Sequence, residues 1–217
     1  MTLAQIDASA RALGLAVRGA FHPTADDAAP DGTGTLILLG PDEPAFWRTF
    51  LASPEYRDGA PHRLDRWSKR VVSELAQPLR GAAIFPYDGP PYAPFLWWAE
   101  RSGECWSSPV GLLVHATAGL FISFRAALAV PERLTLASAP DSPCLSCDDR
   151  PCESACPVGA LGPGQAYDVP ACVAHLKSPA GAACRNGCLV RQSCPVSRRF
   201  GRVPEQSAFH MRAFLGQ

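Results

Sequence analysis

Residues 144–157 read CLSCDDRPCESACP, and residues 172–195 read CVAHLKSPAGAACRNGCLVRQSCP. Eight of the nine cysteines fall in these two stretches. Their order is Cys144-x2-Cys147-x4-Cys152-x3-Cys156-Pro157 and Cys172-x11-Cys184-x3-Cys188-x5-Cys194-Pro195. Each stretch ends in Cys-Pro, so the two form a degenerate duplication. Cysteines clustered in this way bind metal or do redox work more often than they form disulfides in a reducing compartment.

The spacing is close to that of a known class of metal site. In bacterial two-cluster iron–sulfur proteins the run is C-x2-C-x2-C-x3-C-P, and its fourth cysteine binds the other cluster. The following proline cannot continue a hydrogen-bonded run, so it fixes the exit of the chain. We therefore expect two [4Fe-4S] clusters with crossed ligand sets. The first set is Cys144, Cys147, Cys152 and Cys194, and the second is Cys156, Cys172, Cys184 and Cys188.

Two other readings use the same cysteines. Structural zinc also takes four thiolates, usually as two C-x2–4-C pairs, and triplets ending in Cys-Pro fit that pattern poorly. One cluster with spare thiols is the second alternative. Cys105 stands apart from both stretches, and we expect it to be a small buried hydrophobic residue and not a ligand.

The rest of the chain predicts an α+β fold in two domains. We expect a scaffold domain over residues 1–138 and a cluster-binding domain over residues 139–217, because a Pro- and Ser-rich stretch separates them. Apolar spacing predicts helices over residues 2–13, 43–51, 61–76 and 94–101. Apolar runs predict strands over residues 15–17, 35–39, 82–85, 111–114 and 120–130. Strands that alternate with helices predict a central sheet covered by helices.

Composition and charge exclude several classes of protein. Twenty basic and 20 acidic residues give a net charge of zero, which argues against non-specific binding of nucleic acid. Residues 1–20 contain Asp7, Arg11 and Arg18 and lack the apolar core of a signal peptide. The low-charge stretch 109–124 is too short to span a membrane. We expect a cytoplasmic protein with neither nucleic acid nor membrane among its partners.

Two segments of the cysteine-rich part resemble known iron–sulfur proteins. Cys156-Pro-Val-Gly-Ala-Leu161 resembles the Cys-Pro-Thr-Gly-Ala-Ile element of two-cluster ferredoxins. Cys172-Val-Ala-His-Leu176 resembles the Cys-Ile-Ser-Tyr-Leu element of epoxyqueuosine reductases, which also precedes a final group ending in Cys-Pro. Reductive dehalogenases share this general arrangement. The resemblance implies a ferredoxin-like domain that binds two [4Fe-4S] clusters.

Residues 112–126, LLVHATAGLFISFRA, resemble a motif of CblC-type cobalamin-processing proteins. That motif reads roughly His-Pro-x-x-Gly-Gly-Trp-x-x-x-Arg-Gly, and His115, Gly119, Phe121 and Arg125 fall in register with it. The resemblance implies a flavin-reductase-like (nitroreductase-like) scaffold. It also implies cobalamin, or another corrinoid, as a cofactor contacted by Arg125, His115 and Phe121.

Each of these residues also has a purely structural interpretation. Arg125 would pair with a surface carboxylate, and His115 would cap a strand end. Trp98 belongs to an aromatic cluster whose flat faces suit a macrocycle or a flavin, yet aromatic residues at helical spacing are usually core. The cluster consists of Tyr92, Phe95, Trp97 and Trp98.

Together these patterns predict an iron–sulfur redox protein. Single electrons would pass through the two clusters to a redox partner protein, or to a substrate or cofactor docked between scaffold and clusters. If the protein is an enzyme, we expect an iron–sulfur oxidoreductase that acts on a corrinoid or a related cofactor. The alternative is a ferredoxin-type electron carrier without a small-molecule site, and the third reading is the structural zinc protein.

Overall fold

The computed structural model describes all of residues 1–217 and divides into two compact units. Unit 1 consists of Met1–Cys105 and Ser123–Pro140, and unit 2 of Trp106–Ile122 and Asp141–Gln217. The second point at which the chain passes from unit 1 to unit 2, between Pro140 and Asp141, lies close to the boundary expected after residue 138. The segment 106–122 differs from expectation, because it belongs to the cysteine-rich unit. Its side chains Val110, Val114 and Leu120 pack in one apolar cluster with Cys152, Leu161, Val190 and Cys194.

Unit 1 is built on an antiparallel sheet of four strands in the order β1-β2-β6-β3. The strands are β1 (Leu15–Phe21), β2 (Thr35–Pro41), β3 (Ala82–Ile84) and β6 (Ala126–Val130). Ile37 of β2 lies opposite Leu128 of β6. All seven residues of β2 are buried, as its continuous apolar run predicts for a strand covered on both faces.

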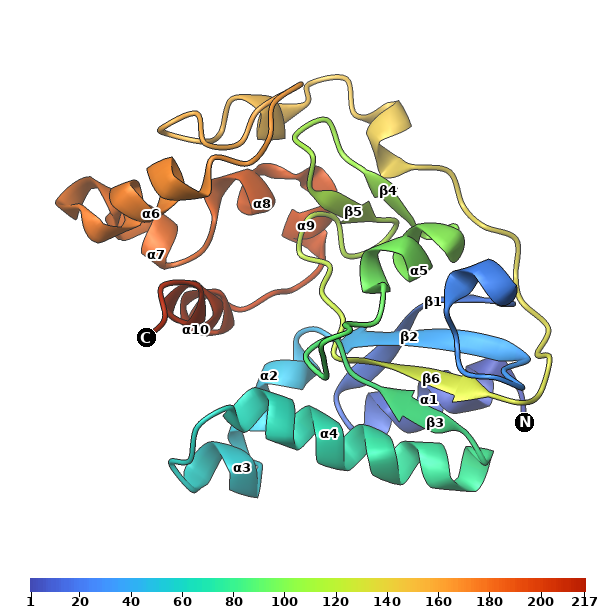
Figure 1. Ribbon diagram of the computed structural model, residues 1–217. Coiled ribbons are helices and arrows are strands. Elements are labelled where there is room, and N and C mark those ends of the chain that lie inside the picture. Colours follow the sequence, from blue (N-terminus) through green and yellow to red (C-terminus); the bar gives the residue numbers. More distant parts are fainter. The chain divides into compact units, whose positions relative to one another are not determined.

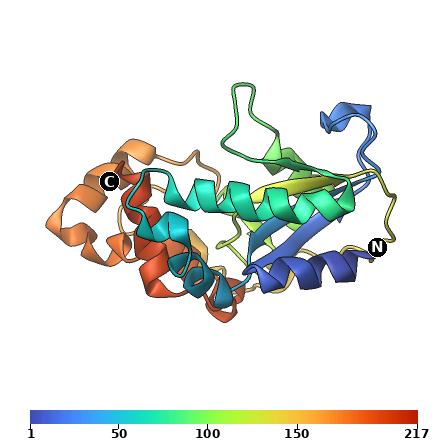
Figure 2. The same cartoon turned by 90° about the horizontal axis from the view of Figure 1, so that it is seen from below.

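Helices cover both faces of this sheet. They are α1 (Leu3–Ala12), α2 (Ala45–Leu51), α3 (Pro54–Arg57), α4 (Arg63–Ala76) and α5 (Phe95–Arg101). Figures 1 and 2 show α1 and α4 on one face and α5 on the other. A capping box between Thr2 and Gln5 starts α1, and α4 buries the stripe Leu64, Trp67 and Val71. The α+β class expected from the sequence is confirmed.

Several predicted elements have different bounds in the structure. The strand expected over residues 15–17 continues to Phe21, and the one expected over residues 111–114 covers Leu113–His115. The strand expected over residues 120–130 is wrong in its first half, because only Ala126–Val130 is a strand. Before it the chain turns at Gly119, whose φ is +57°, and Phe121 N donates to Ala118 O over 3.1 Å. The helix expected from residue 43 begins at Ala45, after Pro44.

Unit 2 consists of short helices and turns around a hairpin. The hairpin pairs β4 (Cys105–Ser107) with β5 (Leu113–His115). The helices are α6 (Val169–Lys177), α7 (Ala182–Arg185), α8 (Leu189–Ser193), α9 (Pro195–Arg199) and α10 (Pro204–Phe214). Two 3₁₀ turns, η3 (Pro143–Ser146) and η4 (Pro151–Glu153), precede them. Across both units, no helix combines the length and the apolar character needed to cross a membrane.

Candidate metal centre

Four thiols of unit 2 line one cavity of about 190 Å³. They belong to Cys144, Cys147, Cys152 and Cys194, the set that the sequence predicts for the first cluster. Apolar side chains, among them Val114 and Leu120, form part of the same lining. The chain therefore gathers four cysteines, up to 50 positions apart in sequence, around one partly open and largely apolar space.

Local turn chemistry places these four cysteines. Ser142 caps η3, where its hydroxyl accepts from Cys144 N over 3.4 Å and Pro143 takes the first helical position. Cys152 lies inside η4. Cys194 has extended backbone between α8 and α9, because Pro195 begins α9 and has no N–H to continue α8. Cys147 is the C-cap of η3, so all four cysteines lie in short helices or at their ends.

The electrostatics of this first group show that its members are neighbours. Burial raises the pKa of the Cys144 thiol, and the charges of Cys194 and Cys147 raise it further. Burial also raises the pKa of the Cys152 thiol, together with the charges of Cys144, Cys194 and Cys147. The contributing cysteines in both cases come from the same group of four. Cys194 is therefore an electrostatic neighbour of residues 42 or more positions before it.

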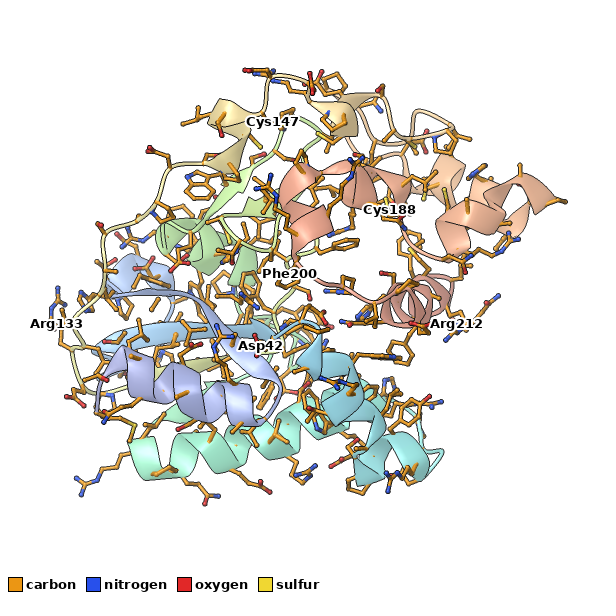
Figure 3. The ribbon with its side chains drawn as sticks, turned by 180° about the vertical axis from the view of Figure 1, so that it is seen from behind. Asp42, Arg133, Cys147, Cys188, Phe200 and Arg212 are labelled. Carbon is orange, nitrogen blue, oxygen red and sulfur yellow. The ribbon has the colours of Figure 1, made fainter.

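The remaining four clustered thiols form a second group. Burial raises the pKa of the Cys184 thiol, and the charges of Cys188, Cys156 and Cys172 add to the rise. Burial likewise raises the pKa of the Cys172 thiol, against a hydrogen bond from Tyr167 that lowers it. The charges of Cys188 and Cys156 raise the pKa of Cys172 as well. Figure 3 labels one thiol of each group, Cys147 and Cys188.

Backbone donors contact sulfurs of the second group. Ala160 N donates to Cys156 Sγ over 3.2 Å, and the backbone of Leu189 hydrogen-bonds Cys184. Cys172 lies in the first turns of α6, which Asp168 caps by accepting from Ala171 N over 2.9 Å. Such outer contacts fix the direction of a metal ligand and tune the metal that it binds.

The two groups border one apolar cluster. Cys152 and Cys194 of the first group are members of it, and Cys144, Cys156 and Cys188 pack against it. Its other members are Val110, Val114, Leu120, Leu161 and Val190. Water is therefore kept from one side of both groups, and a buried, apolar surrounding is one of the factors that set the potential of an iron–sulfur cluster.

No three or more His, Cys, Asp or Glu side chains converge tightly enough to hold a single metal ion. One zinc ion needs four thiolates at about 2.3 Å from a common centre. In a [4Fe-4S] cluster each thiolate binds a different iron atom, so the four sulfurs need only surround a shared volume. The cavity of the first group provides such a volume, and the donor set of four thiols fits the cluster.

The residues that the sequence suggested for a corrinoid or flavin are divided between the units. In unit 2, His115 Nδ1 accepts from Thr117 N over 3.0 Å and from Ala118 N over 3.1 Å. The ring of His115 therefore closes the turn that leads to Gly119, to which its backbone is also paired. The ring of Phe121 lies 5.2 Å from the guanidinium carbon of Arg202.

The other two residues lie in unit 1. Arg125 Nε donates to Ser68 Oγ over 3.0 Å, and Arg125 Nη2 binds Asp65. Trp98 is buried and its Nε1 donates to Asp27 O over 2.6 Å. Both polar side chains thus engage partners within their own unit. Cys105 is 2 % exposed, as expected for a buried hydrophobic residue, and burial raises the pKa of its thiol to about 12.

Sequence reasoning did not identify three polar neighbours of the thiol groups, Ser108, Ser142 and Tyr167. The Ser-Pro-Cys order at residues 142–144 is an N-cap signature and could have identified Ser142. Ser108 and Tyr167 reach the thiol groups through tertiary packing, for which the sequence carries no local signal. In comparisons with protein-family models, curated proteins and solved structures, nothing matched this chain.

Proposed function

We propose that this chain is an iron–sulfur redox protein that holds two [4Fe-4S] clusters in unit 2. Single electrons pass through them to a redox partner, substrate or cofactor. The observation that supports this proposal is the division of eight thiols into two groups of four, one of which lines a single cavity. On this proposal unit 1 is a flavin-reductase-like scaffold and unit 2 a ferredoxin-like domain.

Bound clusters would supply reversible one-electron chemistry, and the chain sets its conditions. The apolar cluster of unit 2 shields one side of both thiol groups from water. The N–H of Ala160 donates to Cys156 Sγ of the second group. Such a donor stabilises the more negative reduced state, so it raises the potential at which the protein accepts an electron.

Paired cysteine substitutions test the crossed ligand sets. Cys194→Ser should remove about half of the iron, because it disables one of two clusters. Adding Cys144→Ser should remove little more, since both residues belong to the same group. Adding Cys184→Ser instead should remove nearly all of the iron. Cys105→Ser is the control, and it should keep the full iron content.

Two results would contradict the ligand sets. If the variant lacking both Cys194 and Cys184 keeps half of the iron, these two cysteines share a cluster and the groups are not crossed. If zinc replaces iron in the wild-type protein, the chain is a structural zinc protein. Metal analysis of anaerobically purified protein distinguishes these cases.

A plain electron carrier is the second candidate function, and the state of Arg125 favours it. Its guanidinium binds Asp65 and Ser68 of its own unit, so an anionic ligand would have to displace a carboxylate. Titration with cob(II)alamin and with flavin, followed by absorbance, separates the two functions. A spectral shift that Arg125→Ala abolishes supports the enzyme, and no binding of either compound supports the carrier.

A further inference from the structure

Ser108 occupies a fixed position at the start of the turn between β4 and β5. Its backbone N–H donates to Leu112 O over 2.9 Å, and its carbonyl accepts from Gly111 N over 2.9 Å. The residue is 6 % exposed. The backbone of Ser108 is therefore held in place by the hairpin, and the residue is shielded from bulk water.

The hydroxyl of Ser108 is buried without a hydrogen-bond partner. A buried polar group left in this state costs about 1–3 kcal/mol, so it is rare and points to a partner that completes it. Ser108 lines the cavity formed by the four thiols of the first group. Ser146 also lines this cavity, but its hydroxyl is directed to Pro143 O at 3.5 Å.

We propose that Ser108 Oγ donates a hydrogen bond to a sulfur of the cluster held by the first group, and so raises the reduction potential of that cluster alone. The inference rests on the proposed function, since it requires a cluster in this cavity. A hydroxyl donor stabilises the added negative charge when the cluster accepts one electron. The hydroxyl keeps its proton throughout, and the electron comes from the external reductant.

The test is a redox titration of anaerobically purified protein, followed by electron paramagnetic resonance, on Ser108→Ala and Ser108→Thr. We expect Ser108→Ala to keep the iron content and to lower the midpoint potential of one cluster. Ser108→Thr retains a hydroxyl and should stay near the wild-type potential. Ser146→Ala also removes a hydroxyl from the cavity lining, but this hydroxyl is directed to Pro143 O. The variant should leave both midpoint potentials unchanged.

Three outcomes bear on the inference in different ways. Unchanged potentials in Ser108→Ala, with full iron content, overturn it. If Ser108→Ala loses iron, Ser108→Thr decides the matter. The inference stands when Ser108→Thr keeps both the iron and the wild-type potentials, and it is overturned when the midpoint potential of Ser108→Thr differs from that of the wild type. Wild-type protein without iron contradicts the proposed function itself, which metal analysis detects before any titration.

Discussion

Gly119 supports the first thiol group through one close contact, and Gly119→Ala should break it. The residue has a φ of +57°, and an added Cβ would lie 2.5 Å from Ser197 N and 2.6 Å from Ser197 Oγ. Ser197 is 2 % exposed and accepts from Leu120 N over 2.8 Å. The methyl group therefore meets backbone and a buried hydrogen bond, neither of which can move freely.

Two effects contribute to the loss of stability. A left-handed backbone costs about 1–2 kcal/mol for a residue with a side chain, and overpacking costs about 1–3 kcal/mol. Gly164→Ala is the matched control within unit 2, since Gly164 has a φ of +68° and no atom within 4 Å of an added Cβ. We expect Gly119→Ala to lose about 1–3 kcal/mol more than Gly164→Ala, which is the overpacking contribution alone.

The damage should also reach the metal centre. Ser197 lies three residues after Cys194, in the helix α9 that Pro195 begins. A shift of α9 away from Gly119 moves Cys194 relative to the other three thiols of the first group. We therefore expect Gly119→Ala to lose iron and Gly164→Ala to keep it.

Urea unfolding followed by circular dichroism gives the stabilities, and metal analysis gives the iron content. Equal destabilisation of the two variants would show that only the backbone conformation matters. The contact with Ser197 would then have no energetic role, and the reasoning would be refuted.

The other predictions concern unit 1. Asp27 is 1 % exposed and binds Arg101 over 2.9 Å, so Asp27→Asn should lower the free energy of unfolding by about 2–3 kcal/mol; a loss below about 0.5 kcal/mol in urea would contradict this. Burial alone would raise the pKa of Asp27, but hydrogen bonds from Arg101, Thr24 and Trp97 hold it well below its usual 3.8. The contribution of Asp27 to the free energy of unfolding is therefore complete above about pH 4 and is lost as the pH falls further. If the free energy of unfolding of Asp27→Asn declines equally steeply with acidification, Asp27 is not the group responsible. Arg125→Ala should cost about 1–2 kcal/mol by losing bonds to its own unit, with unchanged iron content; a loss of iron would contradict the structural role.

The sequence predicts two sets of cysteines from their spacing and the Cys-Pro endings, and the four residues of the first set line one cavity. The sequence likewise predicts α4, whose apolar stripe is periodic, and β2, whose run is uninterrupted. The division between units could not be predicted in full. Residues 106–122 join unit 2 through Val110, Val114 and Leu120, and their partners lie far along the chain.

Arg125 shows what a local motif does not reveal about a side chain. Its partners Asp65 and Ser68 precede it by 60 and 57 residues, and no spacing rule connects them. The apolar residues of the segment 120–124 likewise predict a strand when only local sequence is considered. The turn at Gly119 and the bond from Leu120 N to Ser197 Oγ override that local preference.

Iron and sulfide analysis of the anaerobically purified protein, with the electron paramagnetic resonance spectrum of its reduced form, tests the central claim most directly. Two [4Fe-4S] clusters predict about eight irons and about eight sulfides per chain, and a reduced spectrum that shows two interacting clusters. Fewer than about four irons per chain, or zinc in stoichiometric amount, would contradict the account.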